Sequence, residues 1–119
     1  MGNIFSIIQS IDSANNVRFY EEPAVEGAWF RYEDSIGYGP EIWLRQFRVI
    51  RTTPKGVWLD DYGRERFVLN DAHKRFAYPT IELARKSFLI RKRRQLVHLK
   101  NQIGHVTDVL EAAEEKLNG

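Results

Sequence analysis

Hydrophobic residues in the last third of the chain recur at alternating spacings of three and four positions, which is typical of one face of an α-helix. The repeating positions are Leu96, Leu99, Ile103, Val106, Leu110, Ala113 and Leu117. Thr80 follows Pro79 and can cap the first turn, so we predict a helix over about residues 80–118. The heptad spacing leaves an apolar face that needs a partner, and self-association is the simplest way to cover it.

The length of this helix raises a packing problem. An unbroken helix over the predicted range would be about 58 Å long, whereas a compact domain of this size has a diameter of about 35 Å. The helix therefore either breaks or extends to pair with another chain. Gly104 is its obvious weak point, because glycine costs about 1 kcal/mol relative to alanine in a helix interior. We expect a break or kink between Asn101 and His105, or a close helix crossing there.

The chain before residue 80 has short runs bounded by turn residues, a pattern typical of β-strands. Residues 3–11 fit a helix and an edge strand equally well. Strands are expected at residues 17–20, 27–34, 41–53, 57–60 and 65–69. Short turns at residues 53–56 and 61–63 connect the last three, which favours an antiparallel meander.

These patterns predict an α+β fold in a single domain, because 119 residues leave little room for a second core. Residues 1–79 would form an N-terminal antiparallel β-sheet. Residues 80–118 would form a long C-terminal helix or a helix pair, depending on whether the chain breaks near Gly104. The unpaired heptad face predicts that the domain is oligomeric.

The composition argues against several classes of protein. The chain has no cysteine, which excludes disulfides, thiol catalysis and cysteine-based zinc sites and fits a reducing cytoplasm. Two of its three histidines, His98 and His105, are seven positions apart, too far to bind one metal together. No nucleophile elbow or glycine-rich phosphate loop occurs, and no apolar run could span a membrane. We therefore expect no catalytic residues, metal or cofactor, and no membrane partner.

The distribution of charge is more informative than the net charge of +2. Residues 80–100 carry seven lysines and arginines but one acid, whereas residues 101–119 carry four acids and one lysine. Such a local cationic field attracts anions. The anion could be a phosphate ligand, a nucleic acid or the acidic surface of a partner subunit. Antiparallel helix packing would supply the last of these through Asp108, Glu111, Glu114 and Glu115.

Two groups of residues are candidates for a ligand site. Arg91, Arg94 and His98 share one stripe of the predicted helix, and Arg75 lies just before it, so these four are the candidate phosphate-binding residues. Phe76 and Tyr78 lie beside Arg75 and could stack a nucleobase. The alternative is that both rings only attach the helix to the sheet.

The segment KRFAYPT, followed by IELARKSFLIRKRRQLVHLKNQI, resembles the first Thoeris anti-defence family of phage-encoded proteins. The resemblance covers about residues 42–105. Members of this family sequester cyclic ADP-ribose signals made by bacterial immunity, and some also bind cyclic trinucleotides. The resemblance implies an N-terminal antiparallel sheet, C-terminal helices and a homo-oligomer, for which a hexamer is one arrangement. It also implies ligand pockets with arginine and aromatic residues at subunit interfaces.

The leading functional hypothesis is therefore a non-enzymatic sponge for cyclic nucleotide signals in the cytoplasm of an infected bacterial cell. The ligands would be cyclic ADP-ribose isomers or cyclic oligonucleotides. The alternative is a phage protein that binds nucleic acid, or blocks an effector, through the basic helix at residues 85–100. A third hypothesis is a purely structural oligomer that retains no ligand.

Overall fold

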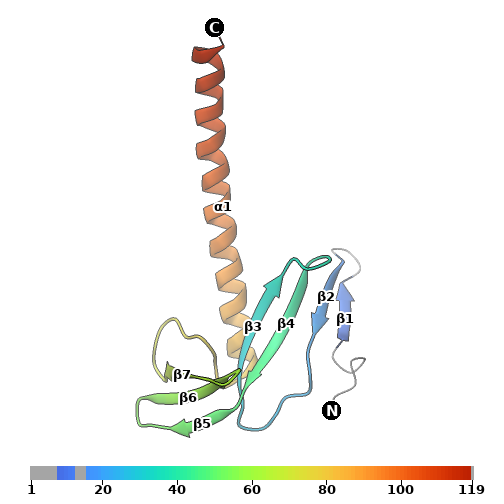
Figure 1. The fold of residues 1–119 in the computed structure, drawn as a ribbon, viewed down its shortest axis with the longest axis vertical. Helices are drawn as coiled ribbons and strands as arrows, with labels where there is room; N and C mark the ends of the chain where they lie inside the picture. Colours follow the sequence, from blue (N-terminus) through green and yellow to red (C-terminus); the bar gives the residue numbers. More distant parts are fainter. Residues whose placement is uncertain (1–7, 13–15, 119) are drawn as a thin grey trace. The chain divides into compact units, whose positions relative to one another are not determined.

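The computed structural model describes residues 8–12 and 16–118. The strands are β1 (Ile8–Asp12), β2 (Val17–Tyr20), β3 (Trp29–Ser35), β4 (Glu41–Phe47), β5 (Val49–Thr52), β6 (Gly56–Asp61) and β7 (Arg64–Leu69), and helix α1 (Ile81–Leu117) follows them (Figure 1). The chain divides into two compact units, residues 1–88 and residues 89–119. All strands and the first two turns of α1 belong to the first unit. The fold class is therefore α+β, as predicted.

The strands form two sheets, so the predicted single meander is wrong. One sheet has the strand order β1-β2-β4-β3 and the other has the order β5-β6-β7. Neighbouring strands are antiparallel, except that β2 and β4 are parallel. Parallel neighbours need a crossover connection, and here strand β3 lies between them in the sequence. At the edge of the sheet, β1 confirms the strand interpretation for residues 8–11, whereas residues 3–7 lie outside the described residues.

The long strand predicted at residues 41–53 is interrupted at Arg48, and its two halves belong to different sheets. The Arg48 carbonyl accepts a hydrogen bond from the Asp60 backbone N–H, at 3.0 Å. Leu44 and Phe47 point to opposite faces of β4, and each is buried in a different hydrophobic cluster. This arrangement explains why neither face of the sequence from residue 41 to residue 53 is purely apolar.

Two tight turns hold the second sheet in register. Tyr62 and Gly63 connect β6 to β7 and have φ angles of 53° and 85°, as a two-residue type I′ hairpin requires. Gly56 begins β6, where a β-carbon would lie 2.2 Å from the Val68 carbonyl oxygen. Only glycine therefore allows β6 and β7 to approach each other this closely at Gly56.

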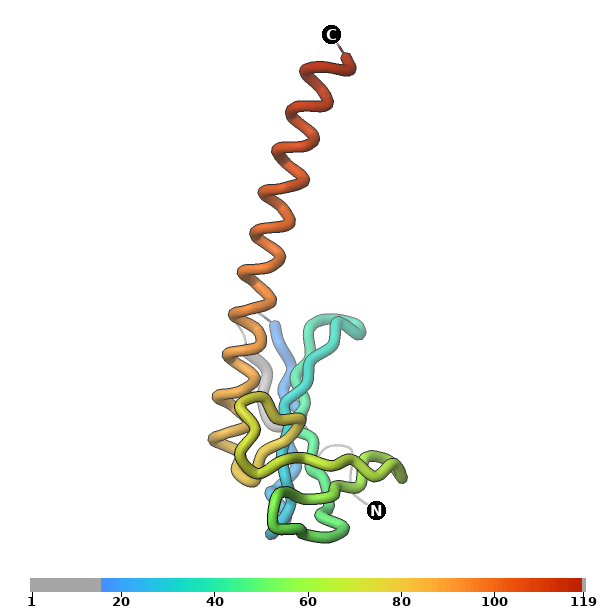
Figure 2. Tube along the Cα trace, turned by 90° about the vertical axis from the view of Figure 1, so that its left-hand side faces the viewer, coloured from blue at the N-terminus to red at the C-terminus, as the bar shows by residue number. Residues whose placement is uncertain are grey.

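The first unit has two hydrophobic clusters. The first consists of Ala28, Phe30, Tyr32, Leu44, Tyr78, Ala84 and Phe88. The second consists of Trp29, Phe47, Val57, Leu59, Val68 and Ala77. Strand β3 contributes alternate residues to both clusters, so both of its faces are covered. The connection from β7 to α1 also contributes to both clusters, and Figure 2 shows this connection turning into the helix.

Helix α1 begins where the sequence predicts. The Leu83 backbone N–H donates a hydrogen bond to Thr80 Oγ1 at 3.2 Å, so the predicted N-cap is confirmed. The predicted break between Asn101 and His105 is wrong, because the helix is continuous to Leu117. No atom of another described residue lies within 4 Å of a β-carbon built at Gly104, apart from its own helix backbone and chain neighbours, so the predicted close crossing is absent there as well.

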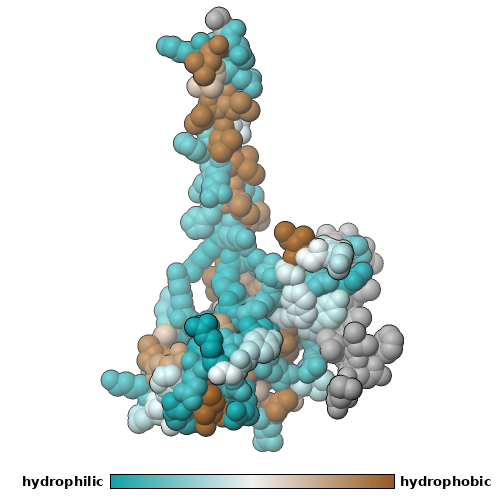
Figure 3. All heavy atoms as spheres, in the orientation of Figure 1, coloured by the Kyte–Doolittle hydropathy of each residue, from teal (hydrophilic) through white to brown (hydrophobic). Residues whose placement is uncertain are grey.

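The second unit is a single helical segment whose hydrophobic residues are exposed. Apolar side chains gather along α1 in the space-filling view (Figure 3). The exposed fractions of the leucine, isoleucine and valine side chains in the heptad stripe range from 46% to 79%; these residues are Leu96, Leu99, Ile103, Val106, Leu110 and Leu117. Figure 3 and these values show that the stripe predicted from the sequence is not covered by the described chain.

Candidate functional site

Arg75 and Tyr78 form one compact pair in the connection before α1. The Arg75 guanidinium lies 4.8 Å from the centre of the Tyr78 ring, and the Arg75 backbone N–H donates a hydrogen bond to the Tyr78 hydroxyl at 3.4 Å. The Arg75 Nε atom is buried and has no hydrogen-bond partner among the described residues. A buried donor without an acceptor costs about 1–3 kcal/mol. An anion that reached this atom would therefore remove a penalty from the protein.

Tyr78 is a core residue with 9% of its surface exposed. Its backbone N–H donates to the Phe30 carbonyl at 2.9 Å, and the Phe30 N–H donates back to the Tyr78 carbonyl at 2.7 Å. These contacts place the ring in the first hydrophobic cluster. A nucleobase could stack on Tyr78 only after the chain around it rearranged, which weakens the role predicted for this residue.

Phe76 is half-buried, and its ring contacts three other side chains. It packs edge-on against Phe47, with ring centres 5.1 Å apart. The guanidinium groups of Arg66 and Arg31 lie 4.0 and 4.8 Å from the centre of the Phe76 ring. Arg31 also donates a hydrogen bond to the Phe76 carbonyl at 2.8 Å. The ring thus anchors the connection to the strands.

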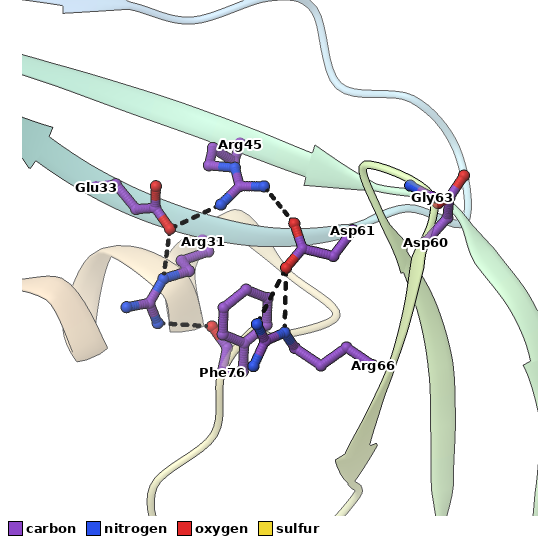
Figure 4. A network of polar contacts seen from close by, with 8 residues as sticks. All are labelled: Arg31, Glu33, Arg45, Asp60, Asp61, Gly63, Arg66 and Phe76. Atoms are coloured by element: carbon purple, nitrogen blue, oxygen red, sulfur yellow. Dashed lines mark hydrogen bonds and ion pairs between the residues drawn. The ribbon is translucent and has the colours of Figure 1, made fainter.

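The arginines around Phe76 belong to a charged network that sequence reasoning missed (Figure 4). Glu33 accepts from Arg31 and from Arg45, both at 2.9 Å. Asp61 accepts from Arg45 at 2.7 Å and from Arg66 at 3.1 Å. The network alternates arginine and carboxylate across strands β3, β4, β6 and β7, so it joins the two sheets.

Ion pairing changes the pKa values within this network. Burial alone would raise the pKa of Asp61, but hydrogen bonds from Arg45 and Arg66 outweigh it and hold the pKa below its ordinary range. Burial would likewise lower the pKa of Arg45, but Asp61 and Glu33 raise it. Both groups are therefore held in their charged forms, so the network stabilises the fold and leaves no free proton donor at Asp61.

The neighbouring Asp60 has a different role. One of its carboxylate oxygens accepts a hydrogen bond from the Gly63 backbone N–H at 2.9 Å, which stabilises the turn (Figure 4). The other carboxylate oxygen accepts from Arg48 at 3.3 Å. The acidic pair Asp60 and Asp61 thus stabilises a turn and an ion network.

A groove of about 690 Å³ lies beside this network. It is lined by Tyr20, Glu22, Glu33, Trp43, Leu44, Arg45, Gln46, Phe47, Arg48, Asp60 and Tyr62. The rings of Tyr20 and Trp43 stack on each other with centres 5.7 Å apart, and the 89% exposed Tyr62 lies over Arg45. Carboxylates outnumber arginines in the lining, so the groove suits a planar ring better than a phosphate.

The remaining candidates lie in the second unit. Arg91, Arg94 and His98 occupy positions i, i+3 and i+7 of α1, so they share one stripe as predicted. Arg94 and His98 are exposed, and Arg91 is half-buried. Within the described residues, no carboxylate lies within ion-pair distance of the side chains of Arg93, Arg94 or Lys100. This segment therefore presents cations that are not neutralised within the described chain.

One cation at the start of the basic segment has a partner inside the first unit. Arg85 Nε donates to the Tyr32 hydroxyl at 3.3 Å, and that hydroxyl lies 3.2 Å from a Glu21 carboxylate oxygen. Burial raises the pKa of Tyr32, although Arg85 lowers it in part. The hydrogen bond to Tyr32 raises the pKa of Arg85. The Arg85 side chain is thus held by a contact within the first unit.

The described residues contain no group of three or more histidine, cysteine, aspartate or glutamate side chains that could hold a metal ion. Among the same residues, no helix is long and apolar enough to cross a membrane. Comparison with protein-family models, curated proteins and solved structures found no match to this chain.

Proposed function

We propose that this protein binds a small phosphorylated ligand without transforming it, and that the ligand is a cyclic nucleotide signal. The proposal rests chiefly on Arg75, whose buried Nε atom lacks an acceptor among the described residues. A phosphate oxygen would supply that acceptor, and hydrogen bonds to charged groups are the stronger ones. The family resemblance adds the ligand class: cyclic ADP-ribose isomers or cyclic oligonucleotides, sequestered by a phage anti-defence protein.

A second anion-binding element is the stripe of Arg91, Arg94 and His98. Two guanidinium groups one helical turn apart can each donate two parallel hydrogen bonds to a phosphate, which lysine cannot do. The His98 ring would add a hydrogen-bond donor to the same stripe.

The proposal omits the base-stacking roles predicted for Phe76 and Tyr78. Both rings pack against other side chains, and arginine guanidinium groups lie over both. Phosphate contacts would therefore dominate recognition. Ligands that share the phosphates but differ in the base should bind with similar affinity.

Native mass spectrometry with cyclic ADP-ribose isomers and cyclic trinucleotides tests this function. We expect integral ligand masses on the protein and release of chemically unchanged ligand on heating. Arg75→Ala and Arg94→Ala should each weaken binding by about 10- to 100-fold, because each removes a charge-assisted contact. Arg64→Ala is the matched control, since Arg64 is an exposed arginine of β7. A protein that ignores every cyclic nucleotide, or variants that bind as well as the control, would contradict the proposal.

Nucleic-acid binding is the second candidate, and one observation favours it. Exposed cations occupy several faces of α1, including Arg93, Arg94 and Lys100, whereas a small ligand would need only one face. A nucleic-acid binder would gain affinity with the length of the strand and lose it steeply between about 50 and 200 mM salt. A gel shift with single strands and duplexes of increasing length distinguishes the two functions.

A further inference from the structure

The second unit carries both an exposed apolar stripe and an uneven distribution of charge, and together they specify a partner. The stripe residues Leu96, Ile103, Leu110 and Leu117 correspond to heptad position a, and Leu99, Val106 and Ala113 correspond to position d. The stripe spans about 33 Å of helix, which is three heptads. Each of its large side chains is about half exposed or more. A second amphipathic helix of the same length would cover it.

We propose that this segment pairs with the same segment of a second copy of the chain, in an antiparallel two-helix coiled coil. In antiparallel pairs, an a residue packs opposite a d residue of the partner. Leu96 then lies opposite Ala113 of the other copy, Leu99 opposite Leu110, and Ile103 opposite Val106. In each of these layers the numbers of the two facing residues add up to 209, so one register pairs every stripe residue with another except Leu117, which lies opposite Lys92 of the other copy.

Charge decides the orientation. Residues 91–94 are four consecutive cations, and Lys92 among them falls at a d position. In a parallel pair, Lys92 would face its own copy across the apolar seam, with the flanking arginines of both copies beside it. Like charges at this distance repel. In the antiparallel register, the two basic clusters lie at opposite ends of the pair, about 37 Å apart along the axis.

The antiparallel register also creates specific opposite-charge contacts. Positions e of the two helices lie next to each other in such a pair, and Arg93 and Glu114 are both e residues. Arg93 of each copy therefore lies beside Glu114 of the other, which gives two equivalent pairs. Arg93 has no carboxylate within ion-pair distance among the described residues of its own chain.

The packing layers favour the same orientation. Ala113 is the smallest residue of the stripe, and the antiparallel register places it opposite the larger Leu96. A parallel pair would place Ala113 opposite itself and leave a gap at that layer. Arg91, Arg94 and His98 fall at positions c and f, which face away from the seam. Pairing therefore leaves the proposed phosphate-binding stripe accessible, and the two proposals can fail separately.

Cysteine pairing tests the register directly, because the natural chain has no cysteine. Leu99→Cys protein is mixed with Leu110→Cys protein in a glutathione redox buffer, and the disulfide products are identified by mass. The antiparallel register predicts the mixed disulfide, because the two β-carbons face each other. It predicts little homodisulfide of either variant, since each cysteine lies about 16 Å along the axis from its own copy. Dominant homodisulfides would establish a parallel pair and overturn the proposal.

A pair of variants outside the register provides the control. Leu99→Cys mixed with Leu117→Cys places the two sulfurs about 10 Å apart along the axis, so the mixed disulfide should be at least tenfold less abundant. Equal yields from the matched and unmatched mixtures would mean that the helices meet without a fixed register. That result would also overturn the proposal.

Charge exchange provides a second test that leaves the seam intact. Arg93→Glu and Glu114→Arg should each weaken self-association about tenfold in sedimentation equilibrium, because each replaces two attractive contacts by repulsive ones. The double variant should return to within about threefold of the natural chain. Glu115→Arg, with the same charge change at outward position f, should have less than a threefold effect. The pairing of Arg93 with Glu114 would be contradicted if the double variant lost as much free energy of self-association as the two single variants lose together.

Discussion

The two units of this protein differ in where their side chains find partners. In the described chain, all buried hydrophobic residues belong to the first unit, and their two clusters share strand β3. Five of its arginines also form ion pairs within the unit, as Arg45 does with Glu33 and Asp61. The segment after Phe88 has the opposite character, because its apolar stripe is exposed and Arg93, Arg94 and Lys100 lack nearby carboxylates among the described residues. The hydrophobic core of the first unit is thus filled by its own residues, whereas the described chain leaves the apolar stripe of the second unit exposed.

The largest expected effect comes from the core of the first unit. Phe47 is 2% exposed, and Phe47→Ala should destabilise this unit by about 3–5 kcal/mol. Ile103→Ala, in the exposed stripe, should leave the stability of the first unit unchanged. Urea unfolding followed by tryptophan fluorescence separates the two, because Trp29, Trp43 and Trp58 all lie in the first unit. A comparable loss in both variants would mean that the units do not fold independently.

Two glycines sharpen the comparison, since the same substitution should have opposite effects. A β-carbon at Gly56 would overlap the Val68 backbone, so Gly56→Ala should destabilise the first unit by about 3 kcal/mol. At Gly104 a β-carbon meets nothing within 4 Å, and Gly104→Ala should stabilise the helix by up to about 1 kcal/mol. Urea unfolding by fluorescence measures the first effect and thermal unfolding by circular dichroism at 222 nm the second. A destabilising Gly104→Ala would indicate close packing against a partner at that residue.

The ion network gives a smaller effect with a defined pH dependence. Asp61→Asn should cost about 1–3 kcal/mol, because it removes the charge that Arg45 and Arg66 share. The folded-state pKa of Asp61 is lowered, so its contribution is complete above the ordinary value of about 3.9 and disappears as the pH falls through the lower folded value. Urea unfolding at pH 7 and at pH 3 should therefore show a smaller difference between the variant and the natural chain at pH 3. A constant difference would contradict the assigned ion pairs.

The smallest effect is expected at Arg48. Its side chain is 71% exposed and pairs with Asp60 at 3.3 Å. Exposed ion pairs contribute little, so Arg48→Ala should change the unfolding free energy by less than about 0.5 kcal/mol. Urea unfolding of the variant measures this change in unfolding free energy. A loss above about 1 kcal/mol would show that Arg48 also stabilises the backbone interruption between β4 and β5.

The elements that the sequence predicted correctly depend on local signals. Thr80 caps α1 through a contact three residues away, and the glycine at position 63 adopts the positive φ angle that its hairpin needs. The predicted break at Gly104 was wrong because its cost of about 1 kcal/mol is small compared with the cost of ending a helix. Glycine alone is therefore weak evidence for a helix end.

The features that sequence reasoning missed depend on contacts between distant residues. The parallel pairing of β2 with β4 and the break at Arg48 follow from how two sheets pack, which no local pattern encodes. Arg45 and Asp61 are 16 positions apart, so nothing in the sequence marks them as partners. Of the candidate site residues, the helical stripe followed from periodicity, whereas the burial of Tyr78 depends on its pairing with Phe30.

Sedimentation equilibrium of the natural chain tests most directly whether the second unit requires a copy of itself. Experiments over a hundredfold range of concentration should show a reversible transition from monomer to a self-associated species. Ile103→Asp should remain monomeric throughout this range while its tryptophan fluorescence stays that of the natural chain. A natural chain that is monomeric at every concentration, with its helix fully formed by circular dichroism, would contradict the requirement for a partner copy.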